Sequence, residues 1–346
     1  MKVVASRWSV VSCCFALYAM LYAFCIPAEA QQPKKVPRIG YVSQSYANDP
    51  GPGLTAFRQG LRDIGYVEGK NILCEYRYAE DKLDRVPNLL DELVQLKVDV
   101  LVVTTRRAII AAKQATKTIP IVMVTTQDPV ATGIIDSLAR PSGNITGLSR
   151  LTQELSGKRL ELLKEAVPTI SRVGVLWNAT STGGDTTVDW KTSGSAAGFK
   201  EYEAAARMLQ IQFRSLEVRG PNPDWEGAFQ AAVKKRVSAF VTIQGPLLNR
   251  YTKQIADLAI KNRLPSISEG SEYVQAGGLM SYSTNDAESF KRAAVYVDKI
   301  LKGTKPADLP VEQPTRFEFI INLKTAKQIG VTIPQSVLFR ADKVIK

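Results

Sequence analysis

Histidine is absent from all 346 residues of the chain. Its absence excludes every mechanism that needs an imidazole, including a Ser-His-Asp triad, histidine acid–base catalysis and histidine metal ligation. Cysteine is nearly as scarce, because three of the 4 cysteines (Cys13, Cys14 and Cys25) precede residue 30 and only Cys74 follows it. One thiol closes no internal disulfide and supplies no structural zinc or iron–sulfur cluster. We expect Cys74, in the strand-like segment 72–76, to be a buried and inert thiol.

Phosphate-binding glycine motifs are also missing. No GxGxxG follows a predicted strand and no GxxxxGK[ST] occurs, so a nucleotide would lack its usual phosphate cradle. Catalysis by a carboxylate pair or by a Ser-Lys pair stays open in principle, but no short motif points to either. The sequence therefore predicts no catalytic residue, no metal and no cofactor.

The chain is basic, with a formal net charge of +12, yet it has few basic clusters. Lysines and arginines alternate with acidic residues, as in 158–165, and the one short basic run is 234–236. Nucleic acid or an anionic membrane surface would be met by a concentrated patch. The pattern favours a solvated basic surface and no nucleic-acid partner.

The first thirty residues have the features of an export leader. Lys2 and Arg7 precede an apolar run over 8–26, and residues 27–30 end it with the Ala-x-Ala pattern that signal peptidase cleaves. We expect a cleaved signal peptide at 1–30 and a periplasmic protein that begins near Gln31. A retained membrane anchor is the alternative, since about 20 apolar residues span a bilayer. Lipidation at Cys25 is disfavoured by the bulky Phe24.

In the remaining chain, the same strand-like pattern occurs twice, 134 positions apart. Arg-Ile-Gly-Tyr-Val-Ser at 38–43 and Arg-Val-Gly-Val-Leu-Trp at 172–177 are strand-like. Each is followed by a polar loop, a helical stretch (56–64 and 196–209) and another strand-like run (72–78 and 211–218). The duplication predicts two similar α/β lobes with a ligand cleft.

Strands and helices alternate through both halves. Apolar runs at 99–103, 120–124, 239–243 and 264–267 are typical of strands covered on both faces. The alternation predicts mostly parallel sheets whose strand-to-helix loops emerge at one edge. Ligands of open parallel sheets bind at that edge.

Short hydrogen-bonding side chains gather where these strands end, and we expect them to line a polar cleft. The candidate ligand-binding residues are Ser43, Gln44, Tyr46, Thr104, Thr105, Thr125, Asp128, Asn178, Gln244, Glu269 and Tyr282. Each has a structural alternative: Ser and Thr cap helices, Asp128 before Pro129 fits a helix N-cap, and the tyrosines fit core or hinge packing.

Four blocks resemble a known family: residues 56–72, 128–147, 158–165 and 307–315 are similar to substrate-binding proteins of ABC importers, in the group related to tryptophan- and tyrosine-binding proteins. The resemblance extends from about residue 38 to 345. It implies a type I periplasmic-binding-protein fold with two Rossmann-like lobes and parallel sheets joined by three crossover segments. Ser142 stands where the family often has a second glycine.

The resemblance also implies connectivity. Lobe 1 takes 31–151 plus 284–305, and lobe 2 takes 152–283 plus 306–346. The crossovers lie near 150–156, 277–283 and 305–314, where Gly277-Gly278 and Pro306, Pro310 and Pro314 suit hinge positions.

The function that follows is an exported, monomeric solute receptor. It would bind a small polar organic ligand, such as an amino acid, by hinge closure and deliver it to an ABC permease in the inner membrane. A ligand-sensing protein that docks on a membrane signalling receptor is the alternative. An exported enzyme would need an acid–base pair that the sequence does not show. A carboxylate ligand would suit Ser43, Thr104 and Thr105, and an ammonium would suit Asp128 or Glu269.

Overall fold

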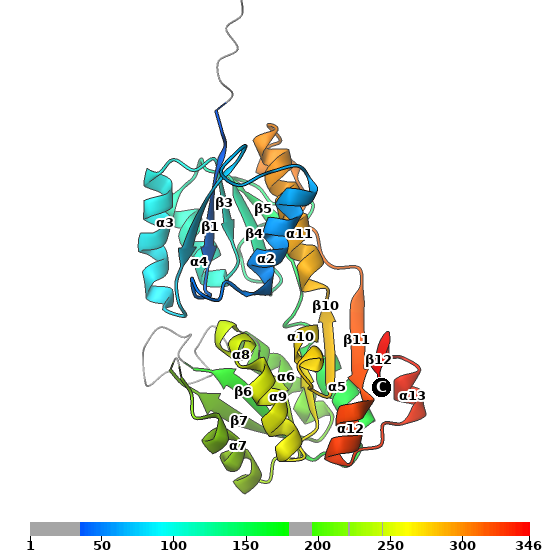
Figure 1. The fold of residues 1–346 in the computed structure, drawn as a ribbon. Coiled ribbons are helices and arrows are strands. Elements are labelled where there is room, and N and C mark those ends of the chain that lie inside the picture. The colour runs from blue at the N-terminus through cyan, green and yellow to red at the C-terminus, as the bar shows by residue number, and fades with distance from the viewer. Residues whose placement is uncertain (1–34, 180–195, 221, 244) are drawn as a thin grey trace, which may run out of the picture. The chain divides into compact units, whose positions relative to one another are not determined.

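The computed structural model contains two β-sheets in its described residues (Figure 1). The structure describes residues 35–179, 196–220, 222–243 and 245–346. By its internal contacts the chain divides into residues 1–36 and residues 37–346, and both sheets belong to the second part. The predicted signal peptide, residues 1–30, lies outside the described residues.

The first sheet has five parallel strands in the order β2-β1-β3-β4-β5. They are β1 (Arg38–Ser43), β2 (Leu73–Tyr78), β3 (Val100–Val103), β4 (Ile121–Thr125) and β5 (Ile145–Ser149). Its helices are α2 (Gly51–Asp63), α3 (Val86–Gln95), α4 (Arg106–Ala115) and α11 (Asp286–Leu301), with a short 3-10 turn η1 (Leu83–Arg85). Ile39 and Tyr41 pack with α2 and α11 on one face, while Val42 packs with α3 and α4 on the other. Burial of both faces explains why β3 is apolar throughout and β4 is apolar up to its last residue, Thr125.

The second sheet has seven strands in the order β12-β11-β10-β9-β8-β6-β7, and only the β10–β11 pair is antiparallel. The strands are β6 (Arg172–Asn178), β7 (Gln212–Val218), β8 (Ala239–Thr242), β9 (Ser266–Ser268), β10 (Met280–Thr284), β11 (Phe317–Asn322) and β12 (Lys343–Ile345). The helices are α5 (Ser156–Ala166), α6 (Ala196–Met208), α7 (Trp225–Lys234), α8 (Pro246–Arg250), α9 (Thr252–Lys261), α10 (Ser271–Gln275), α12 (Leu323–Ile329) and α13 (Gln335–Leu338). The predicted α/β architecture with mostly parallel sheets is confirmed.

The duplicated opening has a packing reason. A side chain on Gly40 in β1 would place its Cβ 2.9 Å from Leu93 of α3, and one on Gly174 in β6 would place its Cβ 2.3 Å from Leu216 of β7. Both glycines therefore make room for a leucine beside the strand. Each repeat keeps a glycine at the third position of its first strand because the neighbouring leucine fills that space.

The segments that connect the two sheets have different bounds from the crossovers predicted from the sequence. Most of the predicted second crossover, 277–283, is occupied by β10, so the chain reaches α11 through Asn285. Gly277, with φ of 109°, turns the chain into that strand. Gly278 lies against the Tyr273 ring, whose nearest atom would be 2.1 Å from an added Cβ. The two glycines thus serve a turn and a close contact.

The third predicted crossover begins beside the first sheet. Thr146 donates a hydrogen bond of 2.6 Å to the Leu309 carbonyl, and Glu312 pairs with the edge strand β5 through the Gly147 carbonyl and the Ser149 amide. After this pairing the chain enters β11 at Phe317. Residues 306–312, assigned to lobe 2 from the sequence, therefore lie along the first sheet, because they satisfy the free edge of β5. The remaining lobe boundaries stay a prediction.

Candidate functional site

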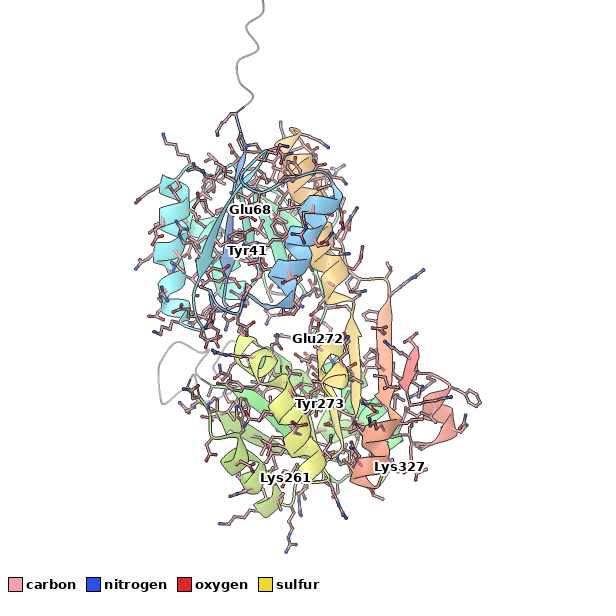
Figure 2. All side chains as sticks on the ribbon, in the orientation of Figure 1. Tyr41, Glu68, Lys261, Glu272, Tyr273 and Lys327 are labelled. Carbon is pink, nitrogen blue, oxygen red and sulfur yellow. The ribbon has the colours of Figure 1, made fainter. Side chains whose placement is uncertain are left out.

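A cavity of about 180 Å³ lies where β1, β3 and β5 end. Tyr41, Ser43, Thr104 and Arg150 line it from this edge of the first sheet. Further lining comes from the first turn of α2, from the start of α11, and from helices α8 and α10. Figure 2 labels two of the lining residues, Tyr41 among the strands of the first sheet and Glu272 on α10. The position agrees with the rule that parallel sheets bind ligands outside their carboxyl edge.

The first turn of α2 presents its backbone to this cavity. Its N-cap, Pro50, makes no side-chain hydrogen bond, and the turn carries no acidic residue. Gly53 is required here because a Cβ would lie 2.7 Å from the Phe290 ring. The initial N–H groups of a helix carry partial positive charge, so this end of the cavity favours an oxygen acceptor or an anion.

Arg150 and Asp286 form an ion pair in the cavity wall. The Arg150 Nη1 donates to Asp286 Oδ2, and the two side chains are 14% and 26% exposed. Thr284 Oγ1 donates to the other oxygen, Asp286 Oδ1, over 3.1 Å. The Arg150 guanidinium also lies 5.6 Å from the centre of the Phe290 ring. Three contacts thus fix two opposite charges at the start of α11.

The cavity carries further charges of both signs. Asp49 precedes α2, Arg250 ends α8 and Glu272 lies in α10, and all three line the cavity. The Arg250 guanidinium lies 5.4 Å from the centre of the Tyr46 ring. A lining with both charges can form ion pairs with a ligand that carries an anionic and a cationic group.

Two of the predicted site residues are held by Asp81 instead of lining the cavity. Gln44 Nε2 donates to Asp81 Oδ1 over 2.8 Å, and the Tyr46 hydroxyl donates to Asp81 Oδ2 over 3.2 Å. Burial raises the pKa of Asp81, and these two hydrogen bonds oppose the rise. Burial and the Asp81 carboxylate together raise the pKa of Tyr46 to about 12. Asp81 therefore fixes Tyr46 beside Arg250, itself a cavity residue.

Three other predicted residues cap local backbone. Thr105 is the N-cap of α4 and accepts from the Ala108 amide, and Thr125 accepts from the Gln127 amide. Asp128 accepts from the amides of Val130 and Ala131 over 2.8 and 3.2 Å. Residues 129–133 form a turn and not a helix, so the structural alternative for Asp128 is changed from a helix N-cap to the cap of a turn. None of the three lines the cavity.

The predicted residues of the second sheet are mostly buried. Asn178 ends β6 with 7% exposure, and Tyr282 stacks on Phe317 with ring centres 6.0 Å apart. Glu269, 5% exposed, accepts from Arg159 over 3.4 Å. Gln244 lies outside the described residues.

Arg159 joins two connecting segments beneath this group. It is fully buried, and it donates over 2.7 Å both to the Thr152 carbonyl and to the Tyr282 carbonyl. Thr152 follows β5, and Tyr282 lies in β10 just before α11. A buried guanidinium with these acceptors fixes the two segments relative to each other.

Cys74 is partly buried against the core of the first sheet. Burial raises the pKa of its thiol to about 11, which agrees with the predicted inert cysteine.

Of the predicted ligand-binding residues, the cavity brings together Ser43 and Thr104. Sequence reasoning missed Arg150, Asp286, Glu272 and Arg250. Arg150 directly follows β5, so the same strand-end rule could have found it. Asp286 opens a helix that follows β10, which also satisfies that rule. The other two lie within helices, where no strand-end signal exists.

The sequence profile of the ABC transporter substrate binding protein family matches residues 52–345. The chain belongs to this family. A protein named tyrosine-binding protein in Clostridioides difficile (strain R20291) is 26% identical over 278 residues, which are 80% of this chain and 75% of that protein. The family comprises substrate binders, which are not enzymes.

Solved structures share the fold of this substrate-binding protein. A conserved domain protein from Vibrio cholerae is 26% identical, with a TM-score of 0.75 over 90% of this chain and 100% of that one. An ABC domain from Streptococcus pneumonia in complex with L-Trp is 23% identical, with a TM-score of 0.71 over 89% and 100% of the two chains. The predicted periplasmic-binding-protein fold is confirmed.

Members of this family typically work outside the cytoplasm. Within the described part of the substrate-binding protein, no helix is long and apolar enough to cross a bilayer. Across the same residues no group of three or more Cys, Asp or Glu side chains is placed to hold a metal ion.

Proposed function

We propose that this substrate-binding protein is the exported receptor of an ABC importer and that it binds an amino acid with an aromatic side chain. It delivers this ligand to a permease in the inner membrane. The observation that carries the proposal is the cavity, whose wall has fixed charges of both signs beside aromatic rings.

An amino acid needs three kinds of contact, and the cavity wall offers each. The carboxylate can be met by Arg150, by the first turn of α2 and by the hydroxyls of Ser43 and Thr104. The ammonium can be met by Glu272 or Asp49. An aromatic side chain can pack against Tyr41 and Phe290. The names of the relatives that bind tyrosine and L-Trp agree with such a ligand.

Apart from Gln244, the other residues predicted from the sequence do not contact the ligand in this proposal and instead support the residues that line the cavity. Gln44 and Tyr46, held by Asp81, position the cavity residue Arg250. Thr105, Thr125, Asp128, Asn178, Glu269 and Tyr282 shape the loops and segments around the cavity. Gln244 stays a predicted ligand contact. We propose that the receptor works as a monomer in the periplasm after cleavage of residues 1–30.

Three measurements test the proposal. Native mass spectrometry of the purified protein should show a co-purifying species with the mass of an aromatic amino acid. Titration calorimetry of refolded, ligand-free protein should then detect binding of L-tyrosine or L-tryptophan and much weaker binding of L-alanine. Uptake of the bound amino acid by vesicles that contain the cognate permease should depend on the protein. Tight binding without such uptake would favour the sensing role.

A further inference from the structure

Arg150 has more donor capacity than its surroundings use. A guanidinium carries five N–H donors in a planar fork. The hydrogen bond that the structure gives this side chain runs from Nη1 to Asp286, and within the described residues the buried Nε–H has no acceptor. A buried donor is costly to leave unpaired, so this site is incomplete as it stands.

The Arg150 side chain belongs to the wall of the cavity. Arg150 lines it, together with Asp286 and Phe290, which hold the guanidinium in place. Thr284 in turn fixes the Asp286 carboxylate. A guanidinium whose one edge is tied to a protein carboxylate keeps its other nitrogens for a second planar acceptor, as bidentate recognition requires.

We propose that Arg150 is the anchor for the ligand's carboxylate and that Asp286 holds Arg150 in position for it. The assignment deepens the proposed function and rests on it. It makes the negative charge of the ligand, and not the ring alone, a requirement for binding. Amines and amides of the same side chain then bind more weakly, because an amine offers no acceptor to Arg150 and an amide offers one neutral carbonyl oxygen in place of the two charged oxygens of a carboxylate.

Affinities of the unaltered protein test this requirement first. We compare L-tyrosine with L-tyrosinamide and L-tryptophan with L-tryptophanamide by titration calorimetry. Each pair keeps the side chain and the ammonium and differs in the carboxylate charge. We expect the amides to bind at least about 30-fold more weakly, the lower end of the loss seen when one partner of a desolvated charge pair is removed. Equal affinities for acid and amide would overturn the assignment while leaving an aromatic binding function intact. Failure of all four compounds would overturn the proposed ligand class itself.

Substitutions at Arg150 and Asp286 test whether this pair causes the difference in affinity between acid and amide. In Arg150→Met combined with Asp286→Asn, which leaves no unpaired charge, the acid should lose at least about 30-fold in affinity and the acid–amide difference should collapse. Arg150→Lys should keep part of the difference. Arg292→Met combined with Glu312→Gln is the matched control, because it removes both partners of another Arg–carboxylate pair, whose residues do not line the cavity. A persistent acid–amide difference in the double variant, with unchanged circular dichroism, would remove Arg150 from the ligand site.

Discussion

Individual polar residues at a strand end differ in whether they line the cavity. Ser43 and Thr104 line it, while Thr125 and Asp128 do not. A hydrogen bond from a neighbouring amide does not separate the two groups, since Ser43 accepts from the Ser45 amide over 3.1 Å much as Thr125 accepts from the Gln127 amide. The difference lies in which loops border the cavity.

Substitution of Asp128 tests whether this residue caps a turn or binds the ligand. We expect Asp128→Ala to lower the free energy of unfolding by about 1 kcal/mol, because two backbone amides lose their acceptor. Affinity for the ligand should change less than about twofold. Thermal melting and titration calorimetry of this variant measure both quantities. A loss of affinity of tens of fold with an intact fold would instead support the ligand role that the sequence suggested.

Among the secondary-structure elements, residues 306–312, which follow α11, extend the edge of the first sheet. This segment pairs with β5 and is also held by two contacts from α11. Arg292 donates to both oxygens of Glu312 over 2.8 and 2.7 Å, and the Tyr296 hydroxyl donates to the Pro310 carbonyl over 2.5 Å. The helix that returns to the first sheet therefore also fixes the segment that leaves it.

The Arg292–Glu312 contact predicts a pH dependence of stability. Hydrogen bonds from Arg292 lower the pKa of Glu312 below its usual value of 4.5, against the opposing effect of burial. A carboxyl with a lowered folded-state pKa stabilises the fold above its unfolded pKa and loses this contribution as the pH falls through the folded value. Glu312→Gln should thus be less stable than the original protein at pH 7, by less than about 1 kcal/mol since both side chains are partly exposed.

Urea unfolding between pH 7 and pH 3 measures this effect. The difference between the two proteins should shrink as the pH falls below about 4.5. Glu226→Gln, which breaks a more exposed pair with Lys261, is the control and should change stability less at pH 7. A constant difference across the whole pH range would contradict the electrostatic explanation.

At the scale of the whole molecule, the proposed receptor function requires a change of shape when ligand binds. Arg159 and the Arg150–Asp286 pair join the connecting segments at two places, and we expect these segments to act as the hinge. Under the proposed function, the ligand stabilises a closed form that the permease recognises.

Small-angle scattering provides the corresponding measurement. With saturating L-tyrosine or L-tryptophan, whichever binds, we expect a smaller radius of gyration than without it. The melting temperature should also rise with ligand concentration, since a ligand at 100 times its Kd adds about 2.7 kcal/mol of stability. A higher melting temperature with an unchanged scattering curve would argue against closure.

Local sequence patterns predicted the main strands and the edge of the first sheet at which the cavity lies. Apolar runs such as 100–103 and the repeated glycines of β1 and β6 specify buried parallel strands, because periodicity and close packing are local properties. Which polar groups meet depends on tertiary packing. Asp286 reaches Arg150 across 136 positions and Asp81 reaches Gln44 across 37, and no local pattern encodes such approaches. The strand-end residues therefore predicted the sheet edge where the cavity lies, whereas the charges in the cavity wall depend on how distant segments pack.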